Sequence, residues 1–204
     1  EQTIIVAPVG CSVFAYDYFD VDGAEAAHGR APAMATGIKR VNPDSIVFTY
    51  QGDGDLAAIG TAETIHACNR GENITIIFIN NGIYGMTGGQ AGPTTPHGAR
   101  AVTTQYGNFE HPFNLPYLAA AGGASFVARW TVIHARRLEW TLRKAMMHPG
   151  FSFVEILSPC PVGWKMPPVQ ARTWMKENME KNFEVKLFRD QEDAHRGTGR
   201  MELL

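Results

Sequence analysis

Five short runs of apolar residues recur along the chain, and each is bounded by glycine, proline or other turn-forming residues. The runs are Thr3–Val9, Ile46–Gln51, Ile74–Asn80, Ser125–Arg129 and Phe151–Ile156. A strand with one solvated face alternates apolar and polar residues, whereas an unbroken apolar run is typical of a strand covered on both faces. The pattern therefore predicts five buried strands in a mostly parallel sheet.

The segments between these runs carry helical patterns. Helices are predicted over Ala24–Val41, Leu56–Arg70, Leu115–Ala121, His134–Met147 and Val169–Met179. The second of them gathers its apolar residues on one stripe and is followed by Gly71, a residue that commonly ends a helix. Strands that alternate with helices indicate a doubly wound α/β fold, so we expect helices on both faces of the sheet.

The chain divides into an α/β domain, residues 1–160, and a C-terminal part, residues 161–204. The C-terminal part combines a proline-rich stretch, one helix and a charged tail, and we expect it to contact a partner. Within the first part, Gly82–Pro112 has no period, and a loop of this length is usually functional or disordered. The chain starts at Glu1 in a strand-like run, so we also expect a segment upstream of it.

The composition argues against several classes of protein. With 45% hydrophobic and 19% charged residues the chain is globular. A net charge of −2, without clustered lysine and arginine, indicates no nucleic-acid partner. No apolar run approaches the roughly 20 residues that span a bilayer, so no membrane association is expected. Three scattered cysteines do not suit a disulfide scaffold and indicate a reducing, cytoplasmic location.

Four glycine-rich or polar motifs each follow a predicted strand. They are Gly10–Ser12, Gly52–Asp55, Asn80–Gly82 and Ser158–Cys160. In a parallel sheet, ligands gather beyond the carboxyl ends of the strands. We therefore expect the four motifs to meet at one edge of the sheet and to form a binding site there.

The second and third motifs have the composition of a metal-bridged diphosphate site. Gly52 and Gly54 allow close approach of a ligand to the backbone, and the following helix offers free N–H groups to an anion. Asp53, Asn81 and a backbone carbonyl at Ile83, with phosphate oxygens, would provide the oxygen ligands that Mg²⁺ prefers. The alternative is two ordinary turns, because Asp-Gly and Asn-Gly are common turn dipeptides.

Longer stretches carry a family resemblance. They are HGRAPAMATGIK (28–39), QGDGDLAAIG (51–60) and NNGIYGMTGGQAGPTTP (80–96), followed by residues 106–129 and 150–161. Together they resemble the β subunits of 2-oxoacid:ferredoxin oxidoreductases over nearly the whole chain apart from its tail. The resemblance implies a thiamine diphosphate-binding fold for residues 1–160.

The resemblance also implies roles for individual residues around the cofactor. Asp53, Asn81 and the Ile83 carbonyl match the family's Mg²⁺ ligands. The residues implied to surround the diphosphate are Gly52, Gly54, Asp55, Tyr84, Thr87 and Gly88. With Asp53 and Asn81, and with Ser12 and Gly85 as further candidates, they form the expected cofactor-binding set.

Three further residues are candidates for a part in catalysis. Met86 matches the bulky apolar residue that lies beneath the bent cofactor. His28 and Arg30 open a helix at the same edge, where a cation could reach a diphosphate or a substrate carboxylate. The alternative for His28 and Arg30 is a structural role at the helix start.

Cys11 and Cys160 correspond to two ligands of the family's [4Fe–4S] cluster, which is held by four thiolates. Related chains supply the other pair from a Cys-x-x-Cys near the N terminus, and this sequence contains no such motif. The alternative is a pair of half-buried thiols that only pack beside the sheet. Cys68 lies on the apolar stripe of a predicted helix and is expected in the core.

The implied activity is the coenzyme A-dependent oxidative decarboxylation of a 2-oxo acid to an acyl-CoA and CO₂, with electrons passed through the cluster to ferredoxin. The glutamate that activates the cofactor is expected from a partner α subunit. Gly88 carries no side chain where some relatives place a lysine for the substrate carboxylate, so that contact is also expected from the partner. 2-Oxoglutarate is the favoured substrate, before branched-chain 2-oxo acids and then pyruvate.

Two alternatives share the same cofactor motif. A non-redox thiamine diphosphate-dependent decarboxylase subunit would have no use for Cys11 and Cys160, so iron content separates it from the oxidoreductase. A non-catalytic subunit that merely retains the fold would bind no cofactor.

Overall fold

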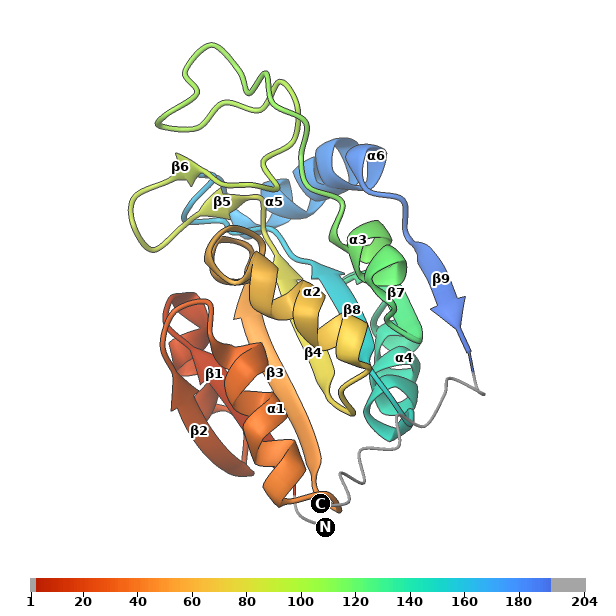
Figure 1. Ribbon diagram of the computed structural model, residues 1–204. Coiled ribbons are helices and arrows are strands. Elements are labelled where there is room, and N and C mark those ends of the chain that lie inside the picture. Colours follow the sequence, from red (N-terminus) through yellow and green to blue (C-terminus); the bar gives the residue numbers. More distant parts are fainter. Residues whose placement is uncertain (1–2, 192–204) are drawn as a thin grey trace.

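The computed structural model describes residues 3–191, and it shows a seven-stranded sheet with the order β2-β1-β3-β4-β8-β7-β9 (Figure 1). The strands of this sheet are β1 (Thr3–Pro8), β2 (Asp22–Ala26), β3 (Ile46–Gly52), β4 (Thr75–Asn80), β7 (Phe126–Thr131), β8 (Ser152–Leu157) and β9 (Lys186–Asp190). Neighbours pair in parallel except β9, which runs antiparallel to β7. The five predicted strands are confirmed, with ends shifted by one or two residues.

Helices cover both faces of the sheet, as predicted for a doubly wound α/β fold (Figure 1). The helical segments of the described chain are the 3₁₀ segment η1 (Cys11–Asp17), α1 (Ala31–Val41), the π-helix η2 (Gly54–Ile59), α2 (Thr61–Arg70), α3 (Leu115–Gly122), α4 (Ala135–Met147), α5 (Pro168–Trp174), the π-helix η3 (Met175–Met179) and α6 (Glu180–Asn182). Of these, α5 and α6 lie beyond the carboxyl ends of the strands (Figure 1). Among the described residues, no helix is both long enough and apolar enough to cross a bilayer.

The two faces of the sheet pack into two hydrophobic clusters. Ile76 and Phe78 of β4 face the cluster that α1, α2 and α3 cover, whereas Ile77 between them faces the cluster beneath η1 and α4. Successive side chains of a strand point to opposite faces, so a strand covered on both faces needs apolar residues at every position. This arrangement explains the unbroken apolar runs in the sequence.

The prediction of one helix over Ala24–Val41 is wrong in its first part. Residues 22–26 form β2, which pairs in parallel with β1, and α1 begins only at Ala31. Gly29 turns the chain with φ of 78°, in the left-handed region, and Pro32 lies in the first turn of α1. Alanine and glutamate favour a helix locally, but pairing with the edge of β1 decides the conformation of residues 24–26.

The segment after residue 160 contributes to the main sheet. Its predicted helix at Val169–Met179 is present within α5 and η3, and Met175, Met179 and Phe183 pack against Leu157 of β8. The strand β9 then extends the sheet at the β7 edge, which the sequence pattern did not predict. The charged tail expected at the end of the chain lies largely outside the described residues.

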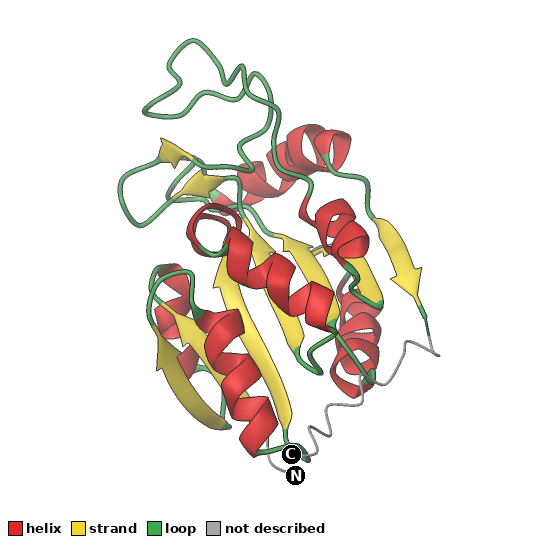
Figure 2. Ribbon diagram, viewed as in Figure 1, coloured by secondary structure: helices red, strands yellow, loops and turns green. Residues whose placement is uncertain are grey.

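The carboxyl ends of the parallel strands share one edge of the sheet, and the long loop extends beyond that edge (Figure 2). This loop is not wholly irregular, because β5 (Ile83–Tyr84) and β6 (Gln90–Ala91) form a short antiparallel hairpin. The predicted site motifs therefore lie at the edge where the hairpin and the loop begin.

Candidate active site

Asp53 lies where β3 ends and η2 begins, and its side chain is 4% exposed. One carboxylate oxygen accepts a hydrogen bond from the Gly54 N–H at 2.8 Å, and the other accepts one from the Thr94 hydroxyl at 2.9 Å. The backbone of Gly82, at the end of β4, also lies close enough to lower the pKa of this carboxylate. Asp53 therefore joins the ends of two adjacent strands.

Burial raises the pKa of Asp53 from its ordinary 3.8 to about 6, although the hydrogen bonds from Thr94, Gly54 and Gly82 oppose this rise. A buried carboxylate is costly because the low-dielectric surroundings disfavour its charge. A bound cation would offset that cost. The donor set therefore fits a metal ion, held by one carboxylate together with neutral oxygens.

The turn after β4 is built around Asn81. Its side-chain oxygen accepts a hydrogen bond from the Ile83 N–H at 3.0 Å, and its carbonyl accepts one from the Trp164 indole at 2.9 Å. Gly82 adopts φ of 72°, which a residue with a side chain rarely adopts. These contacts fix the turn that follows β4, the strand paired with β3, after which Asp53 lies.

Tyr84 packs directly on the glycine after Asp53. A Cβ atom at Gly54 would lie 2.2 Å from the Tyr84 ring, so only glycine fits there. By contrast, nothing lies within 4 Å of the position that a Cβ at Gly52 would take. The backbone at Gly52 is therefore open to a ligand, whereas Gly54 is closed by protein.

The turn between β5 and β6 carries four of the predicted site residues, Gly85, Met86, Thr87 and Gly88. The Met86 side chain is 53% exposed. The Thr87 hydroxyl donates to the side chain of Gln90 at 2.8 Å, and Gly88 has φ of 117°. A hollow of about 630 Å³ opens beside this hairpin, between Tyr84 and the loop segment 103–110.

The thiols of Cys11 and Cys160 are brought together from opposite ends of the chain. Burial raises the pKa of Cys11, and the nearby charges of Cys160 and Asp53 raise it further, whereas a hydrogen bond from the Met86 N–H lowers it. The Gly163 N–H donates to the Cys160 sulfur at 3.2 Å.

Paired thiols with N–H donors are the surroundings that iron–sulfur ligands use. Cys68 does not join them, since it is 1% exposed in the core beneath α2, as predicted. Within residues 3–191 no group of three histidine, cysteine or acidic side chains could hold a metal ion. The two thiols fit half of a four-thiolate site.

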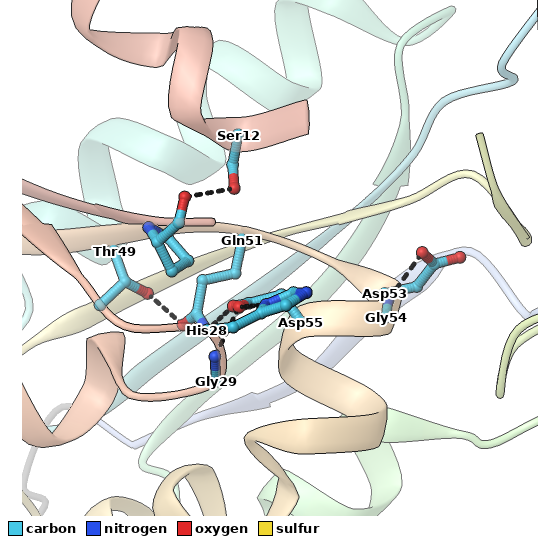
Figure 3. Close-up of polar contacts among 9 residues, drawn as sticks. Ser12, His28, Gly29, Thr49, Gln51, Asp53, Gly54 and Asp55 are labelled. Carbon is cyan, nitrogen blue, oxygen red and sulfur yellow. Dashed lines mark hydrogen bonds and ion pairs between the residues drawn. The ribbon is translucent and has the colours of Figure 1, made fainter. Parts of the chain in front are cut away.

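Asp55 points away from Asp53 and toward the loop before α1 (Figure 3). Its carboxylate accepts hydrogen bonds from the Gly29 N–H at 2.6 Å, from the His28 Nδ1 and from the Gln51 amide. Protein donors thus occupy both oxygens of Asp55. The group orients the His28 ring, whose side chain is 41% exposed.

The remaining predicted residues make contacts within the protein. The hydroxyl of Ser12 donates to the carbonyl of Pro8 at 3.3 Å (Figure 3), and Arg30 pairs with Glu63 of α2. The structure therefore brings Asp53, Gly54, Asn81, Tyr84 and the two cysteines together, while the polar groups of Ser12, Asp55 and Arg30 are engaged elsewhere.

Three residues that hold this site were not predicted. Thr94 holds Asp53, Thr95 donates to the Gly82 carbonyl at 2.6 Å, and Trp164 holds the Asn81 carbonyl. Thr94 and Thr95 are fully buried although they lie in the long loop. The sequence offered only a weak signal for Trp164: a buried tryptophan needs a hydrogen-bond acceptor for its N–H, but no local pattern identifies the acceptor.

The chain is similar to known proteins over most of its length. Residues 8–156 match the family "Thiamine pyrophosphate enzyme, C-terminal TPP binding domain". The 2-oxoglutarate synthase subunit KorB of Archaeoglobus fulgidus is 44% identical over 187 residues, which cover 92% of this chain and 70% of that protein. The ketoisovalerate oxidoreductase subunit VorA of Methanothermobacter thermautotrophicus is 43% identical over 203 residues, covering 93% of this chain and 42% of that protein.

One solved structure is similar in both sequence and fold. It is a 2-oxoglutarate:ferredoxin oxidoreductase from Magnetococcus marinus, with 2-oxoglutarate, coenzyme A and succinyl-CoA bound. The TM-score is 0.79 and the identity 32%, over 86% of this chain and 60% of that chain. The resemblance inferred from the motifs is confirmed: the chain belongs to the thiamine pyrophosphate enzymes, and among them to the β subunits of 2-oxoacid:ferredoxin oxidoreductases.

Proposed function

We propose that this β subunit binds thiamine diphosphate with Mg²⁺ and, together with an α subunit, catalyses oxidative decarboxylation of a 2-oxo acid to an acyl-CoA and CO₂. The observation that carries this proposal is the buried carboxylate of Asp53, held between the ends of β3 and β4. A charge in that position is costly unless a cation joins it.

The metal would be held by the Asp53 carboxylate, the Asn81 side-chain oxygen and the Ile83 carbonyl. Both Asn81 and the Ile83 backbone belong to a turn that is already ordered by hydrogen bonds. To bind the metal, the Asn81 oxygen either shares its hydrogen bond with the Ile83 N–H or exchanges it for the ion. When bound, thiamine diphosphate supplies a nucleophilic thiazolium carbon and an acceptor for the electrons released on decarboxylation.

The diphosphate would lie against the open backbone at Gly52 and the hairpin turn. Gly85, Thr87 and Gly88 would line the diphosphate there, and the Thr87 hydroxyl and the Gly88 N–H would exchange their present bonds to Gln90 and to the Gly85 carbonyl for the ligand. Gly54 and Tyr84 close the wall between the strand ends. The structure leads us to assign Ser12 and Asp55 an indirect share in this binding, through the walls that their hydrogen bonds hold.

Met86 would lie beneath the cofactor and support its bent shape, since the residue belongs to the hairpin turn and is 53% exposed. His28 would contact the substrate. The contact between His28 Nδ1 and the Asp55 carboxylate fixes the ring and leaves Nε2 available. Arg30 would place a positive charge at the same edge, where its ion pair with Glu63 positions the guanidinium.

Cys11 and Cys160 would bind a [4Fe–4S] cluster with two thiolates from outside the described residues. Their N–H donors, Met86 and Gly163, stabilise thiolate charge. The Met86 N–H belongs to the turn proposed for the cofactor, so electrons would have a short path from cofactor to cluster and then to ferredoxin.

The α subunit would supply the activating glutamate and part of the substrate site. 2-Oxoglutarate is the favoured substrate, because the Archaeoglobus relative is a 2-oxoglutarate synthase subunit and the Magnetococcus structure holds 2-oxoglutarate. A branched-chain 2-oxo acid is the second candidate, since the Methanothermobacter relative is a ketoisovalerate oxidoreductase subunit. Pyruvate is the third.

The test is the cofactor and iron content of the protein purified without oxygen, together with the chain that accompanies it. Thiamine diphosphate with about four irons per β chain, the content of one such cluster, would support the redox enzyme. Cofactor without iron would favour the non-redox decarboxylase subunit and leave Cys11 and Cys160 as packing residues. Absence of bound cofactor even after incubation with Mg²⁺ and thiamine diphosphate would overturn the proposal.

Two variants test the Mg²⁺ site and the iron–sulfur site independently. Asp53→Ala is expected to lose both Mg²⁺ and thiamine diphosphate, and full cofactor affinity in this variant would contradict the metal assignment. Cys160→Ser is expected to keep the cofactor and to stop electron delivery. Undiminished reduction of a dye acceptor by Cys160→Ser would exclude its role as a cluster ligand.

A further inference from the structure

A fully buried ion pair lies behind the turn that carries Asn81. Arg129 of β7 and Glu155 of β8 are register partners, and both are 0% exposed. The Arg129 Nε donates to a carboxylate oxygen of Glu155 at 2.7 Å. Taking two charges out of water is expensive, and a pair of apolar residues of similar size is often at least as stabilising. The pair therefore calls for a role beyond stability.

The ion pair reaches the cofactor edge through Asn80. The second oxygen of Glu155 accepts a hydrogen bond from the Asn80 amide at 2.6 Å, and the Asn80 oxygen accepts one from the Gly82 N–H at 3.0 Å. Asn80 is itself 0% exposed. An unbroken chain of hydrogen bonds thus runs from Arg129 to the backbone of the turn at Gly82, which lies close enough to Asp53 to lower its pKa.

Several contacts also fix Arg129, at the other end of this series of hydrogen bonds. Arg129 donates from its two terminal nitrogens to the side chain of Asn114 at 2.8 Å and to the carbonyl of Glu184 at 3.1 Å. Its guanidinium also lies over the rings of Phe183 and Phe188, at 5.0 and 5.4 Å from their centroids. The planar guanidinium cannot shift without breaking several of these contacts.

We infer that Arg129, Glu155 and Asn80 are positioning residues, which set the geometry of the Asn81–Ile83 turn against Asp53 so that the Mg²⁺ ligands are preorganised. The inference rests on the proposed function, because it concerns the same metal site. Residues that orient metal ligands typically alter affinity or activity by about 10–100-fold when they are changed.

The test compares Asn80→Ser with Thr75→Val in the complex purified with its accompanying chain. A serine is too short to bridge Glu155 and Gly82, and it leaves the ion pair intact. Thr75 lies at the opposite end of the same strand and donates to the Ala145 carbonyl at 3.0 Å, so its variant loses a buried hydrogen bond far from the site. The measurement is the Mg²⁺ concentration that half-saturates binding of thiamine diphosphate, followed by protein fluorescence.

Asn80→Ser is expected to need at least about 10-fold more Mg²⁺, with Thr75→Val within about twofold of the wild type at a similar loss of melting temperature. The double variant Asn80→Asp/Glu155→Gln exchanges the amide and the carboxylate between the two positions and keeps the number of hydrogen bonds. Its Mg²⁺ affinity is expected to be higher than that of Asn80→Ser. Unchanged Mg²⁺ dependence in Asn80→Ser, or equal weakening in Thr75→Val, would overturn the inference.

The wild-type complex provides a second readout that does not depend on a variant folding. Without cofactor, amide hydrogen exchange in a peptide spanning 80–84 is expected to be slower than in the neighbouring turn 85–89. Equal exchange rates would contradict a preorganised turn. Should the wild-type complex bind no Mg²⁺ and thiamine diphosphate at all, the proposed function itself fails, which is a separate result.

Discussion

The carboxylate of Asp53 is kept in surroundings that disfavour its charge. Burial raises its pKa to about 6, although Gly54 and Thr94 each donate a hydrogen bond to one of its oxygens. Asp55, two residues away, accepts hydrogen bonds from the Gly29 N–H and the Gln51 amide. The two acids therefore divide two tasks within one turn. Asp55 orders the loop before α1, and Asp53 is the acid proposed to bind the cation.

The charge of Asp53 should cost stability in the cofactor-free protein. Its folded pKa lies above its ordinary 3.8, so the folded state binds the proton more tightly. Stability must then fall as the pH rises from about 4 to about 6 and stay level above that range. Asp53→Asn removes this titration and is expected to be more stable than the wild type at pH 7, by about 3 kcal/mol at most, at about 1.4 kcal/mol per pK unit.

Urea unfolding of both cofactor-free proteins at pH 4 and pH 7 measures this difference. The advantage of Asp53→Asn is expected to be present at pH 7 and to shrink toward zero at pH 4. An advantage that is the same at both pH values would show that titration of Asp53 is not its origin.

The thiols of Cys11 and Cys68 should differ in reactivity. Burial raises the pKa of Cys68 to about 12 and encloses its thiol, whereas Cys11 is exposed with a smaller rise in pKa. Alkylation needs an accessible thiolate. In cluster-free protein at pH 8, iodoacetamide is expected to modify Cys11 while Cys68 stays unmodified until urea is added, as followed by peptide mass spectrometry. Equal labelling of the two in the folded protein would contradict the packing of α2.

At the scale of elements, the junction of β3 with η2 places two glycines in opposite surroundings. The Tyr84 ring from β5 closes the space at Gly54, and the space at Gly52 is open. Within this turn, Gly54 packs against β5, and Gly52 leaves its backbone open. The two glycines can be tested separately.

Gly54→Ala is expected to lower the free energy of unfolding by about 1–3 kcal/mol, because the new methyl group meets the Tyr84 ring. Gly52→Ala is its matched control and is expected to leave stability within about 0.5 kcal/mol. Under the proposed function, Gly52→Ala weakens cofactor binding without affecting stability, since its methyl group enters the ligand's space. Urea unfolding and thiamine diphosphate titration measure both effects, and equal destabilisation by the two variants would contradict the packing of Tyr84 on Gly54.

Helix α1 contains a glycine with no packing role. Gly37 is exposed, and nothing lies within 4 Å of a Cβ built there. Alanine is favoured over glycine inside a helix by about 1 kcal/mol. Gly37→Ala is therefore expected to raise the free energy of unfolding by about 0.5–1 kcal/mol in a denaturant titration, and a loss of stability would show that the position makes a contact.

For the whole molecule, the segment after residue 160 is integrated with the sheet. Phe183 is 1% exposed and packs with Leu157 and Met179. The Arg129 guanidinium lies over its ring. The segment also supplies β9 to the main sheet. Its expected contact with a partner would therefore be made by a surface that is part of the folded domain.

Phe183→Ala is expected to cost about 3–5 kcal/mol, as for other large core residues replaced by alanine. The loss should appear in one cooperative transition, because the segment and the sheet share a core. Val169→Ala, at a position that is 81% exposed, is the control and should change stability by less than about 0.5 kcal/mol. A separate early transition in Phe183→Ala would show that the segment unfolds independently.

The sequence by itself determined the parallel core and the place of the site. The unbroken apolar runs report burial on both faces, and the topology of a parallel sheet brings residues after successive strands to one edge. Asp53 and Asn81 could therefore be placed together without coordinates, because both signals are local: a run of apolar residues and the polar turn that ends it.

Only the tertiary structure decided which partners these residues have. Residues 24–26 form a strand because the edge of β1 is beside them, and β9 forms because β7 has a free edge. The contact of Thr94 with Asp53 and the bond of Asn80 to Glu155 join positions 41 and 75 residues apart. Periodicity reports which face of an element is buried, but such pairings depend on how the elements pack, so no local pattern encodes them.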